Sequence, residues 1–91
     1  MLTLTRRAGI VLRTLLDQRP ISDRLFVRLD LHSEGCALAI DQERTGDEAV
    51  SFEGKKTIIM DPYTAESCVG RMLDCNGMEF ILRAGYEFSD S

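Results

Sequence analysis

Residues 25–41, LFVRLDLHSEGCALAID, contain two strand-like runs on either side of a turn that carries a cysteine. In the first run, Leu25–His32, apolar and polar side chains alternate, which is the period of a β-strand with one buried face. The second run, Ala37–Asp41, continues this alternation after the turn Ser33-Glu34-Gly35-Cys36. We therefore expect two strands separated by this turn, with the thiol of Cys36 presented at a strand end.

An amphipathic helix is expected before these strands, because apolar residues recur there at the spacing of one buried helical face. Thr5 is a suitable N-cap. The helix should end near Gln18, because Arg19-Pro20 follows and the residue before a proline disfavours helical geometry. Gly9 weakens such a helix, unless close packing requires the missing side chain. A short strand, Leu2–Leu4, should come first.

A second helix is expected to begin at Asp61-Pro62, which combines a capping acceptor with proline at the first helical position. Its buried stripe comprises Ala65, Cys68, Val69, Met72 and Leu73. Asn76-Gly77 should close it, since glycine suits the left-handed position after a helix end. Cys68 then belongs to the core, whereas Cys75 lies at the helix end with partial exposure.

The remaining expected elements are strands. They lie at Glu48–Phe52 and Thr57–Met60, which flank a tight hairpin turn at 53–56, and at 78–83 and 85–88. The order β-α-β-β-β-β-α-β-β indicates an α+β fold with two helices packed on largely antiparallel strands. With 91 residues and 44% apolar content, residues 1–91 suit one small domain.

Composition excludes several classes of function. No apolar run approaches the roughly 20 residues of a membrane span, and Met1–Arg7 does not read as a signal peptide. Three irregularly spaced cysteines make a poor disulfide framework, so we expect a cytoplasmic chain with reduced thiols. The net charge of −4 argues against nucleic acid as the partner.

The order of elements resembles the A-type iron–sulfur carriers, which have the HesB/IscA-like fold. The matching features are the opening Leu2-Thr3-Leu4-Thr5, the strand Leu25–Leu31 running into Gly35-Cys36, the strand Thr57–Met60 ending at Asp61, and the segment Gly85-Tyr86-Glu87-Phe88. The similarity covers nearly the whole chain. The first seven residues also resemble the carbon storage regulators, but the helical periodicity of residues 6–18 and the acidic charge favour the carriers.

The resemblance implies a protein that hands iron or an iron–sulfur cluster to client proteins. Carriers of this family use one cysteine after the long strand and a Cys-Gly-Cys pair in a C-terminal tail. Cys36 stands at the first position, whereas Ser89-Asp90-Ser91 offers no counterpart to the pair. The chain thus resembles a divergent member of the family.

The candidate metal ligands are therefore Cys36 and, as a further contributor, His32. Two Cys36 thiolates across a homodimer would supply soft ligands for iron or a cluster. The alternative is a small, partly buried cysteine that binds nothing, beside an exposed histidine. The carboxylates of the connection, Asp41, Glu43, Asp47 and Glu48, are expected to be solvated. No catalytic constellation is evident, so we do not expect an enzyme.

Two functions remain open at this point. The first is a divergent carrier in iron–sulfur cluster assembly, which binds iron or a cluster through Cys36 at a subunit interface. The second is an interaction module that keeps the fold, binds no metal and docks onto client or assembly proteins. Fold alone does not choose between them.

Overall fold

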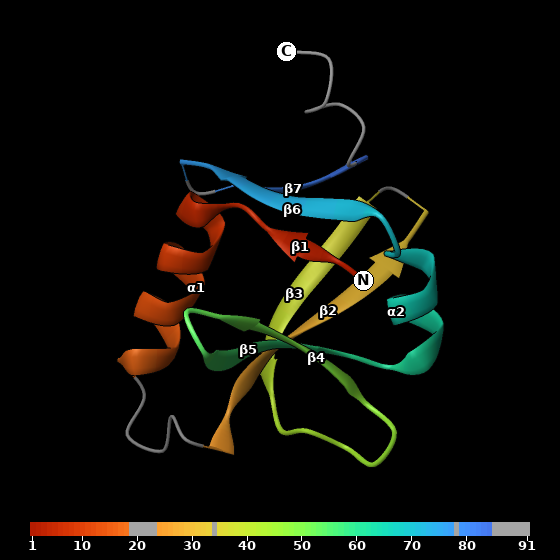
Figure 1. Ribbon diagram of the computed structural model, residues 1–91, viewed down its shortest axis with the longest axis horizontal. Helices are drawn as coiled ribbons and strands as arrows, with labels where there is room; N and C mark the ends of the chain where they lie inside the picture. Colours follow the sequence, from red (N-terminus) through yellow and green to blue (C-terminus); the bar gives the residue numbers. More distant parts are fainter. Residues whose placement is uncertain (19–23, 34, 78, 85–91) are drawn as a thin grey trace.

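The computed structural model describes residues 1–18, 24–33, 35–77 and 79–84. Within these ranges the chain forms two helices and seven strands (Figure 1). Their bounds are β1 Thr3–Leu4, α1 Arg6–Asp17, β2 Phe26–His32, β3 Gly35–Asp41, β4 Glu48–Phe52, β5 Lys55–Met60, α2 Pro62–Ser67, β6 Arg71–Asn76 and β7 Glu79–Ala84. The expected α+β class is confirmed. The strand expected at 85–88 lies outside the described residues.

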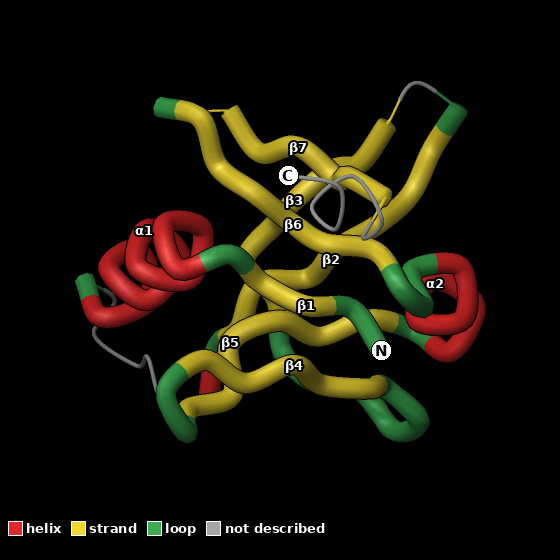
Figure 2. Tube along the Cα trace, turned by 45° about the horizontal axis from the view of Figure 1, so that its top comes forward, coloured by secondary structure: helices red, strands yellow, loops and turns green. Residues whose placement is uncertain are grey.

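The strands build two sheets, one of order β3-β2-β5-β4 and one of order β1-β6-β7. Both sheets are mixed, because β2 runs parallel to β5 and β1 runs parallel to β6, while the other neighbours are antiparallel. Figure 2 shows the β6–β7 pair lying across β2 and β3, with α1 and α2 on opposite flanks of the sheets. This crossing creates the space that holds the candidate site.

The core lies between the two sheets and under both helices. Its buried side chains come from both helices, from β2, β4, β5 and β6 and from two positions beside an element, namely Leu2, Leu12, Leu16, Val27, Leu29, Val50, Ile58, Met60, Ala65, Cys68 and Leu73. The described residues include no helix that is long and apolar enough to cross a membrane.

Helix α1 begins where the sequence predicts. The hydroxyl oxygen of Thr5 accepts a hydrogen bond from the backbone N–H of Ala8 at 3.3 Å, which satisfies one of the unpaired donors of the first turn. Gly9 is buried against Phe52 at the end of β4. A Cβ at position 9 would overlap the Phe52 ring, so close packing does require the glycine.

The second helix is much shorter than the apolar stripe predicted. It ends at Ser67, and Gly70 follows with φ +75°, a left-handed conformation that breaks the helix and redirects the chain. Residues Arg71–Asn76 form strand β6 instead. Asn76 is therefore the last residue of β6, and Gly77, with φ +65°, follows it between β6 and β7 rather than closing a helix.

This change moves two side chains from their expected places. Val69 is exposed instead of buried, because it lies in the turn after α2. Cys75 is buried in β6 instead of partly exposed, and its Sγ donates to the carbonyl oxygen of Gly77 at 3.1 Å. Cys68 is fully buried, as expected.

A buried carboxylate, Asp74 of β6, connects three elements. It accepts hydrogen bonds from the Thr5 hydroxyl at 2.8 Å and from the Arg7 guanidinium at 2.7 Å, both beside the start of α1. Arg83 of β7 donates to it at 3.3 Å, and the backbone N–H of Cys75 does so at 2.8 Å. These donors hold the pKa of Asp74 far below its ordinary range, with the Arg7 hydrogen bond as the main cause.

A second buried ion cluster corrects the expectation of solvated loop charges. Arg28 of β2 is only 6% exposed. Its guanidinium donates to Asp47 at 2.6 and 3.1 Å, to Asp41 at 2.7 Å and to the carbonyl oxygen of Gln42 at 3.2 Å. The hydrogen bonds from Arg28 lower the pKa of both carboxyls. The alternating pattern of β2 predicts that Arg28 is exposed, because its neighbours Val27 and Leu29 are the buried positions. In the structure all three residues are buried.

Gly9→Ala should destabilise the protein by about 1–3 kcal/mol, because the added methyl group displaces the Phe52 ring. The sign of this change in stability is informative, because the same substitution at a solvent-exposed helix position would stabilise the protein by up to about 1 kcal/mol. Chemical denaturation measures the difference. In a Phe52→Ala background the same substitution should become stabilising, and a loss of equal size there would refute the packing explanation.

Stability should fall as the pH drops below about 4. The folded-state pKa values of Asp41, Asp47 and Asp74 are lowered, so their contribution is present above the unfolded pKa of roughly 3.9 and is lost on acidification. Asp47→Asn should cost about 2–3 kcal/mol at pH 7 and much less near pH 2. Urea unfolding between pH 2 and pH 7 measures this dependence. Glu48→Gln, at an exposed position, is the control and should change the free energy of unfolding little.

Candidate functional site

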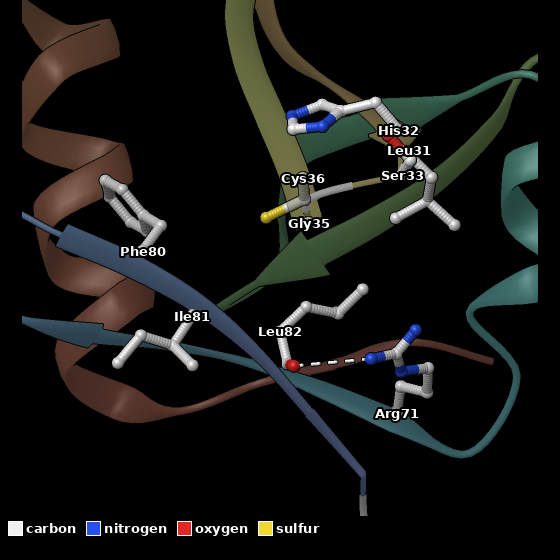
Figure 3. Close-up of a pocket in the computed structure, with 9 residues that line it drawn as sticks. All are labelled: Leu31, His32, Ser33, Gly35, Cys36, Arg71, Phe80, Ile81 and Leu82. Atoms are coloured by element: carbon white, nitrogen blue, oxygen red, sulfur yellow. Dashed lines mark hydrogen bonds between the residues drawn. The ribbon is translucent and has the colours of Figure 1, made fainter.

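A cleft of about 530 Å³ lies where the β2–β3 turn faces strands β6 and β7. Figure 3 shows Cys36 and His32 on the wall that this turn forms, with Arg71 and Leu82 on the opposite wall. Both candidate metal ligands that the sequence proposes line this cleft. Arg71 is an addition that sequence reasoning missed.

Cys36 is the second residue of β3 and lies opposite Leu31 of β2. Gly35 before it has φ +142°, a conformation that L side chains rarely adopt, so glycine lets the strand start directly at the turn. The thiol is half-buried and reaches into the cleft. Burial raises its pKa, and the positive charge of Arg71 opposes this rise in part. Cys36 is therefore a neutral thiol near pH 7 that a metal ion or a base must deprotonate.

His32 is the last residue of β2 and is exposed, as its position in the alternation predicts. Its ring lies on the same wall as the Cys36 thiol (Figure 3). Among the described residues, no group of three or more histidine, cysteine, aspartate or glutamate side chains is placed to hold a metal ion. Within the described part of one chain, the cleft offers Cys36 with His32 as its candidate ligands and no complete coordination sphere.

Arg71 begins β6 and is half-buried. Its Nη2 donates to the carbonyl oxygen of Leu82 on β7 at 3.3 Å, which fixes the guanidinium at the cleft wall. Sequence reasoning missed it because a helix was expected at this position. The available signal was Gly70, which separates α2 from β6.

The other two cysteines lie outside the cleft lining. Cys68 caps α2 and is wholly buried in the core, and burial raises its pKa. Cys75 is buried in β6. All three thiols are free. Among the described residues that line the cleft, Cys36 therefore presents the one sulfur.

Cys68→Ser should lower the free energy of unfolding by about 1–3 kcal/mol, because it buries a hydroxyl among apolar side chains. Cys75→Ser should cost less, since its hydroxyl can still donate to the carbonyl oxygen of Gly77. Thermal and urea unfolding compare the two variants. An unchanged melting temperature for Cys68→Ser would contradict its assignment to the core.

No protein-family model matches the chain, and no curated protein sequence does either. Solved structures do match it. One is SufA from Escherichia coli, which is involved in the biosynthesis of iron–sulfur clusters, with 23% identity, a TM-score of 0.61, and 90% of this chain and 76% of SufA covered. Another is a protein from Aquifex aeolicus studied by NMR in solution, with 20% identity, a TM-score of 0.70, and 90% and 89% of the two chains covered. The chain thus has the fold of SufA, which confirms the expected α+β architecture with two helices.

Proposed function

We propose that the protein acts in iron–sulfur cluster assembly and carries iron or a cluster on Cys36, with a second protomer supplying another Cys36. The observation that carries the proposal is the position of the thiol. Cys36 stands at a strand end and reaches into an open cleft, whereas Cys68 and Cys75 are buried. The shared fold with SufA supports the same process.

The candidate ligand atoms of the cleft, a thiol sulfur and an imidazole nitrogen, are of the kinds that bind iron. A thiolate is the soft ligand that iron–sulfur chemistry uses, and imidazole also binds iron. One thiol cannot complete a site, so a homodimer with two Cys36 residues, and His32 as a further contributor from each chain, is the simplest arrangement. Arg71 adds positive charge on the opposite wall of the cleft, which opposes the rise in the Cys36 pKa and favours an anionic cargo.

In this proposal the protein is a carrier rather than an enzyme, and its partners are client or assembly proteins in the cytoplasm. The acidic composition, with 15 acidic against 11 basic residues, disfavours nucleic acid as a partner. Delivery then depends on a client whose own ligands replace Cys36. The cargo leaves when the client offers more thiolates than the carrier does.

Anaerobic reconstitution with iron and sulfide tests the proposal. The wild type should show charge-transfer absorption in the visible range, and Cys36→Ser should lose it. Cys75→Ser is the matched control, because it also replaces a thiol by a hydroxyl but lies outside the cleft, and it should keep the bands. Native mass spectrometry should find the cargo on a dimer. A colourless wild type would reject the carrier.

The second candidate is an interaction module that binds no metal. It is favoured by the incomplete donor set of the described residues and by the raised pKa of Cys36. Such a module would bind the same client or assembly proteins through its surface. In that case Cys36→Ser should leave partner binding unchanged, whereas in the carrier it should weaken binding of the loaded protein.

A further inference from the structure

The guanidinium of Arg71 differs from the other guanidinium groups that contact β2, β6 or β7. Arg7 and Arg83 pair with Asp74, and Arg28 pairs with Asp47. Arg71 contacts the carbonyl oxygen of Leu82, and no carboxylate oxygen of the described residues lies within 4.0 Å of it. A guanidinium has five N–H donors, so most of those of Arg71 are available to a ligand or to water.

The surroundings of Arg71 restrict what this ligand can be. The cleft volume of about 530 Å³ falls within the roughly 300–1,000 Å³ of small-molecule sites. Among the described residues, the walls combine apolar side chains, such as Leu31, Phe80 and Leu82, with the polar side chains of His32, Ser33 and Cys36 and one arginine. One cation in such a lining suits a single carboxylate, which arginine binds in bidentate fashion.

The facing wall of the cleft adds a second restriction. Cys36 reaches into the cleft from β3 while Arg71 lies across from it on β6 (Figure 3). A molecule held by its carboxylate on Arg71 therefore places its other end near the Cys36 sulfur. If that end is a thiol, one protomer offers two sulfur ligands to the iron or cluster, one from Cys36 and one from the bound molecule.

We infer that the cleft binds a small thiol that carries a carboxylate, with the carboxylate on Arg71 and the sulfur beside Cys36. The role of the sulfur rests on the proposed function, because only a soft cargo needs a second thiolate. The role of the carboxylate rests on Arg71 and the cleft alone. The two parts can therefore fail separately.

The first experiment uses metal-free protein under anaerobic conditions. Reduced glutathione, the probe, is titrated into isotope-labelled protein, and amide shifts are followed by NMR. We expect saturating shifts at Gly35, Cys36, Arg71 and Leu82, with a Kd on the order of 0.1–1 mM. S-methylglutathione, which keeps the carboxylates and lacks the free thiol, should bind similarly.

Two arginine variants make this result specific. Arg71→Gln should weaken glutathione binding about tenfold or more, because it removes a charge-assisted pair. Arg6→Gln removes the same charge from an exposed position outside the cleft and should change the Kd less than about twofold. Arg71→Lys, with well-dispersed spectra as proof of folding, should bind with intermediate strength. Two results would overturn the site. One is the absence of amide shifts at a glutathione concentration 10-fold above the expected Kd, and the other is an Arg71→Gln variant that binds glutathione as tightly as the wild type.

The second experiment adds ferrous iron and sulfide with either glutathione or S-methylglutathione. Charge-transfer bands that strengthen with glutathione, and do not with S-methylglutathione, would support the sulfur beside Cys36. Equal bands with both would overturn that part. Bands absent with both, together with intact glutathione binding to metal-free protein, would reject the proposed carrier function and retain the carboxylate site on Arg71.

Discussion

The buried carboxylate of Asp74 is the contact on which the position of the three-stranded sheet depends. It joins the start of α1, through Thr5 and Arg7, to β6 and to Arg83 of β7. Buried carboxylates are costly unless their lone pairs are satisfied, and here four donor groups satisfy them. Because β6 also carries Arg71 at its first residue, the same contact fixes one wall of the candidate site.

The cleft exists because the two sheets cross. Cys36 belongs to the four-stranded sheet and Arg71 to the three-stranded one, so neither sheet alone could bring them together. Cys36 and Arg71 are 35 residues apart along the chain, so no local sequence motif indicates that they line the same cleft. This explains why Cys36 was found from the sequence and its cationic neighbour was not.

Local signals predicted most of the first sixty residues. The alternation around Val27 and Leu29, the Thr5 cap and the Asp61-Pro62 helix start all correspond to local backbone preferences, and the structure has them. The prediction failed after Ser67, where apolar spacing fitted a helix and a strand equally well. Gly70 and Asn76-Gly77 were the better evidence, since a left-handed glycine ends a short helix and Asn-Gly favours a hairpin. The burial of Arg28 could not be predicted, because its carboxylate partners lie 13 and 19 residues further along the chain.

The ion cluster of Arg28 also has a practical consequence for anyone who modifies this protein. The connection 42–47 has the polar composition of a permissive loop, yet its backbone is held through Asp47 and Gln42 to a guanidinium inside the sheet. An affinity tag, a reporter domain or new chain termini placed there would pull a charged pair out of the protein. The turn at Glu53-Gly54 has open space around its glycine and exposed neighbours. Grafts belong at that turn.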